Sequence, residues 1–182
     1  MNDVTFVFLA GVGNSGSEHW QRIWLDRVET GVWVEHEDWD APDRDEWVSD
    51  LQKAVWKLRG DLVFVAHSLG CLLVAEWANQ RNDPAIRGAF LVAPPDPYGP
   101  GFPPDAGGFG ASVSSRFEFP SLVVASRDDP YGTIDFARGA AETWGSEFVD
   151  LGTRGHINAS SGLGAWDEGW TMLQCFVDGL PE

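Results

Sequence analysis

Short runs of apolar and β-branched residues alternate along the chain with longer segments in which apolar residues recur at helical spacing. Six runs have the length and composition of buried strands: residues 4–10, 32–36, 62–66, 88–93, 121–126 and 147–151. Five segments have a helical period: residues 18–29, 45–58, 69–80, 133–144 and 165–177. Strands that are apolar on both faces and separated by helices indicate a parallel sheet covered on both sides. The pattern therefore predicts an α/β fold.

The alternation contains no linker and no internal repeat, so we expect residues 1–182 to form a single domain. Residues 94–115 interrupt it, because they are rich in proline and glycine and have no apolar period. They follow the fourth predicted strand, at the sheet edge where parallel α/β proteins bind ligands. Two interpretations stay open for this segment: a wall or partial cover of a site, and a tolerated surface insertion.

Composition and charge exclude several classes of partner. The chain is 43% hydrophobic and 22% charged, the balance of a globular protein, and 28 acidic against 12 basic residues give a net charge of −16. Such a chain repels polyphosphates and anionic lipids, so we expect neither a nucleic-acid nor a membrane partner. No basic signal-peptide region, no apolar run of ~20 residues and no disulfide framework are present. We therefore expect a cytoplasmic protein, and the sequence does not indicate its oligomeric state.

The strongest local signal for chemistry surrounds Ser68. The sequence AHSLG, centred on this serine, joins the predicted strand 62–66 to the predicted helix 69–80. A nucleophile elbow typically lies between a strand and a helix and has the pattern small residue, any residue, serine, any residue, glycine. The residues two before and two after the serine are small because the chain turns too sharply for larger side chains. A plain helix N-cap is the alternative role for such a serine. The flanking strand and helix favour the elbow.

A serine nucleophile needs a base, and the base needs an acid to orient it. His156 follows the last predicted strand, at the same sheet edge as Ser68 and in the Ser–Asp–His order of this type of site. Capping, strand-end or packing roles are expected for the other histidines: His19, His36 and His67. The acid is expected after the fifth strand, where Asp128 and Asp129 are adjacent. Their spacing leaves the two aspartates as equal candidates.

Backbone amides stabilise the oxyanion that forms when a serine attacks a carbonyl. We expect one at Leu69, which follows the nucleophile at a helix N-terminus. The second is expected at Val12, in the glycine-rich loop after the first strand. Gly11 and Gly13 of this loop are candidates for the substrate pocket, because glycine allows the backbone to approach a ligand closely.

The same loop has an alternative interpretation. The glycines from Gly11 onward match the pattern G-x-G-x-x-G, which in a βαβ unit binds a dinucleotide. Glu35 and Glu37 are the candidates for the ribose-binding acid that such a site needs. A lone match of this pattern is weak, so we expect no cofactor, and no spacing of ligands indicates a metal.

Ten tryptophans are distributed along the chain. Those at helical core spacing are expected to pack against the sheet: Trp20, Trp24, Trp56, Trp77, Trp166 and Trp170. Trp39 differs because it lies in the acidic stretch 35–46, which follows the second predicted strand at the ligand edge. We take Trp39 as a pocket candidate in an acidic, aromatic rim that disfavours anionic substrates. An ordinary solvated surface is the alternative for this stretch.

Several longer segments together carry a family resemblance: GVGNSGSEHW (11–20), WDAPDRDEW (39–47), VAHSLG (65–70), VAPPDP (92–97), FPSLVVASRDDPY (119–131) and GHIN (155–158). With these, nearly the whole chain resembles the small serine hydrolases related to retinoblastoma-binding protein 9, within the α/β-hydrolase superfamily. The resemblance implies Ser68 as nucleophile, Asp129 as orienting acid and His156 as base. It also implies a six-stranded parallel sheet in the order 2-1-3-4-5-6, with helices on both faces and no large cap domain.

The chain departs from the family in one motif. The sequence LGCLL around Cys71 lacks the glutamate of a Leu-x-Cys-x-Glu motif, so binding to retinoblastoma-type proteins is not carried over. The segment 94–115 is the other point of difference, and it affects the expected shape of the pocket. We therefore favour a serine hydrolase that cleaves a small ester, thioester or amide through an acyl-enzyme. A non-catalytic protein-binding module on the same scaffold is the alternative.

Overall fold

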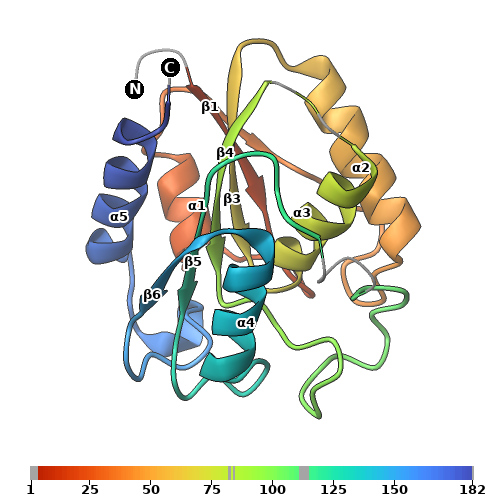
Figure 1. Ribbon diagram of the computed structural model, residues 1–182, viewed down its shortest axis with the longest axis vertical. Coiled ribbons are helices and arrows are strands. Elements are labelled where there is room, and N and C mark those ends of the chain that lie inside the picture. Colours follow the sequence, from red (N-terminus) through yellow and green to blue (C-terminus); the bar gives the residue numbers. More distant parts are fainter. Residues whose placement is uncertain (1–3, 82, 84, 111–114, 182) are drawn as a thin grey trace.

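Strands and helices alternate along the chain as the hydrophobic pattern predicts (Figure 1), except between residues 92 and 121, where the described residues form no helix. The computed structural model describes residues 4–81, 83, 85–110 and 115–181. The strands are β1 (Val4–Leu9), β2 (Gly31–Trp33), β3 (Asp61–His67), β4 (Ile86–Val92), β5 (Ser121–Ala125) and β6 (Glu147–Asp150). The helices are α1 (Trp20–Leu25), α2 (Arg44–Lys57), α3 (Leu69–Gln80), α4 (Ile134–Trp144) and α5 (Asp167–Asp178), with a 3₁₀ turn at Ala159–Ser161.

The strands form one parallel sheet in the order β2-β1-β3-β4-β5-β6. This confirms the expected α/β fold and its strand order, and the described residues contain no large cap domain between the strands. In the register of β1 and β3, Leu9 lies beside Ala66. The loop after β1 and the turn that contains Ser68 therefore leave the sheet at the same edge.

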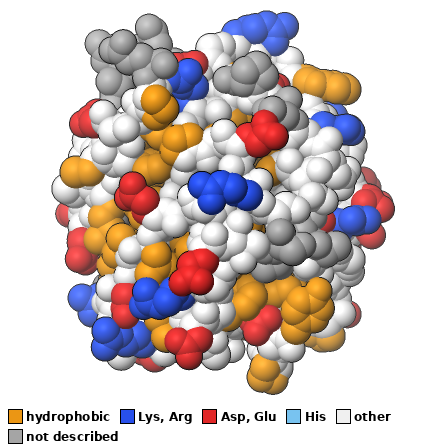
Figure 2. All heavy atoms as spheres, viewed as in Figure 1, with side chains coloured by type: hydrophobic (Ala, Val, Ile, Leu, Met, Phe, Trp, Pro, Cys, Tyr) orange, Lys and Arg blue, Asp and Glu red, His pale blue; other side chains and the backbone are white. Residues whose placement is uncertain are grey.

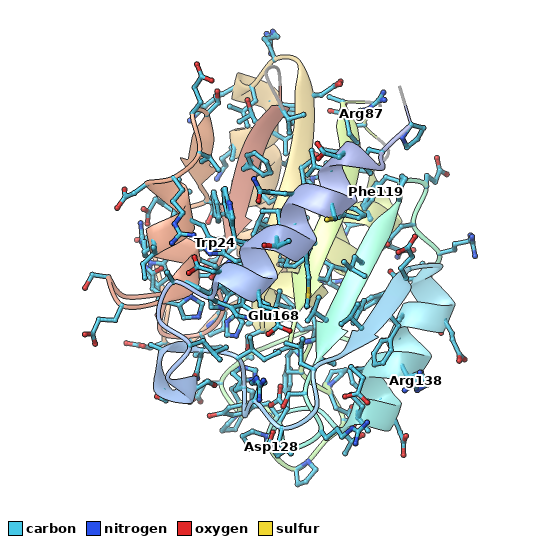
Figure 3. All side chains as sticks on the ribbon, turned by 90° about the vertical axis from the view of Figure 1, so that its left-hand side faces the viewer. Trp24, Arg87, Phe119, Asp128, Arg138 and Glu168 are labelled. Atoms are coloured by element: carbon cyan, nitrogen blue, oxygen red, sulfur yellow. The ribbon has the colours of Figure 1, made fainter. Side chains whose placement is uncertain are left out.

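Alternate side chains of the central strands enter two separate apolar cores. Val7 and Leu9 of β1 pack with residues of α2, α3 and α4, whereas Phe6 and Phe8 pack with residues of α1 and α5. Figure 3 shows Trp24, on α1, beside α5, where its ring contacts that of Trp170 at 5.4 Å between centroids. Helices thus cover both faces of the sheet, as the strand pattern predicts.

The tryptophans predicted to lie in the core do so with one exception. Trp20, Trp24, Trp77 and Trp166 are at most 3% exposed, and Trp170 is half-buried against Trp24.

The prediction for Trp56 is wrong, because its side chain is 69% exposed. The buried stripe of α2 consists of Trp47, Val48, Leu51, Gln52 and Val55. Trp56 follows Val55 directly, and one residue along a helix turns the side chain by about 100°. This places the indole beside the buried stripe rather than within it.

Two elements end three or more residues earlier than their patterns predict. The second strand, expected at 32–36, ends at Trp33, and the first helix, expected at 18–29, ends at Leu25. After Leu25 the chain tightens, since the amide of Arg27 donates to the carbonyl of Trp24 only three residues earlier. A short edge strand is also less open to pairing with another chain than a long one.

The proline- and glycine-rich segment is irregular but attached, although residues 111–114 lie outside the described residues. Its Gly110 amide donates to Glu76 of α3 at 2.9 Å. Its Gly107 exchanges hydrogen bonds with the start of α2, accepting from Arg44 and donating to Pro42. The described part of this segment is therefore tied to two helices near the carboxyl edge of the sheet.

On the face of the molecule drawn in Figure 2, acidic side chains form no single patch but are interspersed with basic ones. Among the helices of the described residues, none combines the length and the apolar character needed to cross a bilayer.

Candidate active site

The turn between β3 and α3 forces Ser68 into a strained conformation. Its backbone angles are φ 54° and ψ −126°, in a region that residues with a Cβ rarely adopt. The Ser68 amide donates to the carbonyl of Val92 at 2.9 Å, and the Cys71 amide donates to the carbonyl of Ser68. These bonds attach the turn to β4 and to the first turn of α3. The strain is therefore maintained by the surrounding backbone.

Glycines flank this turn because the chain has no room for side chains there. A Cβ at Gly70 would lie 2.4 Å from the carbonyl oxygen of Leu9, and a Cβ at Gly11 would lie 2.8 Å from the Cβ of Ser68. The loop after β1 thus passes directly against the serine. Gly11 is therefore needed for the contact with the Ser68 turn rather than for an approach to a dinucleotide, which disfavours the dinucleotide interpretation of this loop.

Three side chains from different loops form a continuous hydrogen-bonded chain. The Oγ of Ser68 lies 2.8 Å from Nε2 of His156, and Nδ1 of His156 lies 2.8 Å and 2.9 Å from the two carboxylate oxygens of Asp129. Because a carboxylate only accepts hydrogen bonds, Nδ1 donates and Nε2 is left to accept from the serine hydroxyl. His156 is 9% exposed and the Asp129 side chain 3%. The arrangement can remove a proton from Ser68.

The structure separates the two aspartates that spacing left equal. Asp129 contacts the imidazole, whereas Oδ1 of Asp128 accepts from Ser126 Oγ and from the amides of Arg154 and Gly155 at 2.7–2.8 Å. The hydrogen bond from Ser126 and those from the amides lower the pKa of Asp128 below its usual value. Figure 3 shows Asp128 among the loops beyond the strand ends. Asp128 therefore holds the loop that carries His156.

Two further side chains hold the backbone around His156. Nε2 of His67 donates to the carbonyl of His156 at 2.9 Å, and the indole N–H of Trp20 donates to the carbonyl of Ile157 at 2.8 Å. Burial lowers the pKa of His67 well below its ordinary value, so its imidazole is neutral. The sequence predicts that His67 packs at the turn. It gives no sign of the hydrogen bond to the His156 carbonyl, because donor and acceptor are 89 residues apart.

A cavity of about 340 Å³ opens beside the serine. Gly11 and Val12 line it from the loop after β1, Pro95 and Pro103 from the segment 94–115, and Tyr131 from the loop after β5. The segment 94–115 thus forms part of the cavity wall, the first of the two interpretations left open. The tyrosine ring also contacts His156, at 4.5 Å between centroids.

Two predicted pocket residues do not line this cavity. Gly13 has open space around it and a φ of 74°, and its amide donates to the carbonyl of Trp39, so it supports the turn after Val12. Trp39 is also absent from the lining of this cavity, and its ring packs against His36 and Trp47 at 4.9 Å and 5.5 Å between centroids. The acidic stretch 35–46 leads into α2, where Asp43 caps the helix and the Trp47 indole donates to the carbonyl of Asp38. None of its residues lines the cavity.

His19 lines the cavity in addition to capping α1. Its Nδ1 accepts from the amide of Gln21 at 3.2 Å, and its ring packs on Trp20. The sequence predicts capping or packing for His19, and both are confirmed. Its place in the cavity wall depends on where α1 lies against the sheet, which no local pattern indicates.

The sheet order, the strained turn after β3 and a cavity at the carboxyl edge define an α/β hydrolase. A family model described as serine hydrolase matches residues 6–175. The chain belongs to the serine hydrolase family. This confirms the expected family, and the closer relation to retinoblastoma-binding protein 9 stays a prediction.

Several solved structures share this fold. A protein described as a YdeN-like hydrolase from Pectobacterium atrosepticum is 30% identical, with a TM-score of 0.86 over 99% of this chain and 94% of that one. The ydeN gene product of B. subtilis is 19% identical, with a TM-score of 0.76 over 97% and 99%. The esterase RhEst1 from Rhodococcus sp. ECU1013 is 14% identical and shares the fold, with a TM-score of 0.75 over 99% and 92%. No curated protein matches the chain.

Proposed function

We propose that the protein hydrolyses a small ester, thioester or amide through an acyl-enzyme formed on Ser68. The observation that carries this proposal is the hydrogen-bonded chain from Ser68 through His156 to Asp129. The cavity of about 340 Å³ is at the small end of the range for ligand pockets, which favours a small acyl substrate.

Each step of the reaction has a residue in position. Ser68 Oγ attacks the carbonyl carbon while His156 Nε2 takes the hydroxyl proton, and Asp129 stabilises the imidazolium. The tetrahedral intermediate expels the leaving group, which receives that proton from His156. Water then attacks the acyl carbon and gives a proton to His156, and the acid departs as Ser68 regains its proton. No net proton is lost from the enzyme.

The oxyanion is assigned to two backbone amides. Leu69 is the first residue of α3, so its amide has no acceptor within the helix. Val12 lines the cavity beside Gly11, and a Cβ at Gly11 would lie 3.3 Å from the Leu69 nitrogen. The loop after β1 and the helix start therefore lie close enough to bind one oxygen between them.

A fluorophosphonate probe tests this proposal, because it reacts with an activated serine. We expect mass spectrometry to locate the adduct on Ser68 and Ser68→Ala to abolish it. Hydrolysis of p-nitrophenyl esters by Ser68→Ala should fall by about 10⁴-fold or more. Asp167→Asn, on the surface of α5, is the control and should label and turn over normally. An unlabelled, folded wild-type protein that is inert to all esters would favour the binding-module alternative.

A further inference from the structure

A second hollow in the surface adjoins the active-site cavity. This groove, of about 790 Å³, shares four lining residues with the cavity: Tyr131, His156, Asn158 and Ser160. Ser68 and the loop after β1 line the cavity but not the groove. His156, the base of the proposed mechanism, therefore lies at the boundary between the cavity that contains the serine and the groove.

Hydrogen-bonding side chains form most of the groove wall. Asp128 and Arg154 come from the loops after β5 and β6, and Glu168 comes from the first turn of α5. Figure 3 shows Glu168 where α5 begins, above the loops that contain Asp128. Three hydroxyl side chains complete this set: Thr153, Ser160 and Ser161.

The charged groups of the groove have donors and acceptors left for a ligand. A guanidinium has five N–H donors, and within the described residues the side chain of Arg154 uses one of them, on the carbonyl of Thr153 at 3.2 Å. Oδ1 of Asp128 already accepts three hydrogen bonds, which leaves Oδ2 available. The exposed carboxylate of Glu168 also accepts only. The groove can therefore both donate to a ligand and accept from it.

The balance of charge in the groove favours an uncharged ligand. Two carboxylates face one guanidinium there, and the whole chain carries a net charge of −16. This field repels an anion, and the guanidinium of Arg154 opposes a cation. A hydroxyl group is uncharged and both donates and accepts, so a ligand with several hydroxyl groups matches this wall.

Tyr131 adds an aromatic surface at the boundary between cavity and groove. It is 38% exposed, and its ring lies 4.5 Å from that of His156 between centroids. Its amide donates to Oδ1 of Asp129 and its carbonyl accepts from the amide of Asp96, so the backbone that carries the ring is fixed. The C–H bonds of a sugar or polyol pack against the electron-rich face of such a ring. The groove thus offers both kinds of contact that a polyhydroxylated alcohol uses.

We propose that the groove binds the leaving group of the substrate and that this group is a polyhydroxylated alcohol, such as a sugar or glycerol. The acyl carbonyl has to lie at Ser68, in the cavity of about 340 Å³. The leaving oxygen has to lie at His156, which protonates it and from which the groove continues. The acyl part is therefore short and the alcohol part large.

The reaction removes a short acyl group from one hydroxyl of the alcohol. The bond between the carbonyl carbon and the ester oxygen breaks, and the alcohol departs with the proton from His156 Nε2. Water then releases the acid from Ser68, as in the mechanism above. This inference rests on the proposed hydrolase function and names the substrate class of the same site.

Two acetate esters of matched shape test the inference. In 6-O-acetylglucose the leaving group is a sugar, and in tetrahydropyranylmethyl acetate it is the same ring without its hydroxyl groups. The kcat/KM of each, from acetate release, is divided by its rate of alkaline hydrolysis to remove intrinsic reactivity. We expect the corrected ratio to favour the sugar ester by about tenfold or more, because the ring without hydroxyls leaves the groove's polar groups unpaired. Glyceryl monoacetate, compared with propyl acetate, distinguishes an open-chain polyol from a sugar ring.

A pair of arginine variants tests the contact itself. Arg154→Leu removes the guanidinium and keeps the backbone amide that Asp128 binds. We expect it to lower kcat/KM about fivefold more for 6-O-acetylglucose than for tetrahydropyranylmethyl acetate, with Ser68 still labelled by the fluorophosphonate. Arg81→Leu is the matched control, because Arg81 is also exposed, also donates to the carbonyl of the preceding residue and lines neither hollow. It should keep the wild-type ratio.

Several results would overturn the inference and leave the proposed function intact. One is a wild-type protein that labels at Ser68 and hydrolyses the acetates without preferring either polyol ester. Another is a higher corrected kcat/KM for acetylcholine than for 6-O-acetylglucose, which would assign the groove to a cation. A rise in kcat/KM from acetyl to octanoyl esters of glucose would place the acyl chain in the groove. A protein that neither labels nor hydrolyses any ester overturns the proposed function and the inference together.

Discussion

The turn that presents Ser68 and the loop that presents His156 are positioned by different forces. Ser68 is placed mainly by close steric contact, since its strained angles and the absence of side chains at Gly11 and Gly70 define the turn. The loop after β6 depends on distant polar partners, because Asp128, His67 and Trp20 hold its backbone. The turn should therefore be intolerant of added volume, and the loop intolerant of lost hydrogen bonds.

The largest expected effect separates the two adjacent aspartates. Asp129→Asn should lower kcat for p-nitrophenyl esters by about 10⁴-fold, because the amide no longer stabilises the proton on Nδ1 and the imidazolium. Asp128→Asn is the matched control, since it makes the same chemical change one residue away. It keeps an oxygen acceptor for the loop amides, so its loss should stay within about tenfold. Equal losses in the two variants would contradict the separate roles.

A substitution at the turn tests the steric side of the comparison. Gly70→Ala places a Cβ 2.4 Å from the backbone oxygen of Leu9, and we expect it to lower the free energy of unfolding by about 3 kcal/mol. Gly139→Ala, on the exposed face of α4, meets no atom within 4 Å and is the control. It should raise the free energy of unfolding by up to about 1 kcal/mol. Urea denaturation measures both, and a stable Gly70→Ala would refute the steric argument.

The buried histidines predict a pH dependence of stability. The folded pKa of His19 is about 4, below the usual 6.5, so the unfolded chain binds a proton first as the pH falls. As the pH falls from about 6.5 to 4, the free energy of unfolding should therefore decrease by about 3 kcal/mol from His19 alone. Above pH 6.5 His19 is neutral in both states, so it causes no change of stability with pH. His67 acts in the same direction. Urea denaturation across this range should give a flatter profile for His19→Asn than for wild type, and parallel profiles would exclude the effect.

The smallest expected effect concerns the hydrogen bond from His67 to the carbonyl of His156. His67→Leu removes the donor and should lower kcat by about tenfold, because the base is then less well positioned. His67→Gln keeps an amide N–H at a similar distance along the side chain and should stay near the wild-type kcat. Steady-state kinetics on one ester compare the two. If leucine and glutamine behave alike, the contact does not position the base.

The sequence was sufficient for those features that depend on neighbouring residues. Apolar runs and helical periods predicted the strands and helices, and the small residues around Ser68 predicted the turn, because both depend on side chains within a few positions. The wrong prediction for Trp56 has a local cause as well, since one residue off the buried stripe of α2 is enough to expose it. The strand order came from the family resemblance, and the structure confirms it.

Tertiary structure decided which side chains meet. Asp128 and Asp129 are identical in type and adjacent, and only the path of the loop after β5 sends one to His156 and the other to the loop amides. Trp39 lies outside the cavity lining because its ring packs against Trp47 of α2. His19 lines the cavity because α1 packs beside the sheet edge. These contacts join residues far apart in sequence, so they depend on how the elements pack and leave no trace in the local pattern.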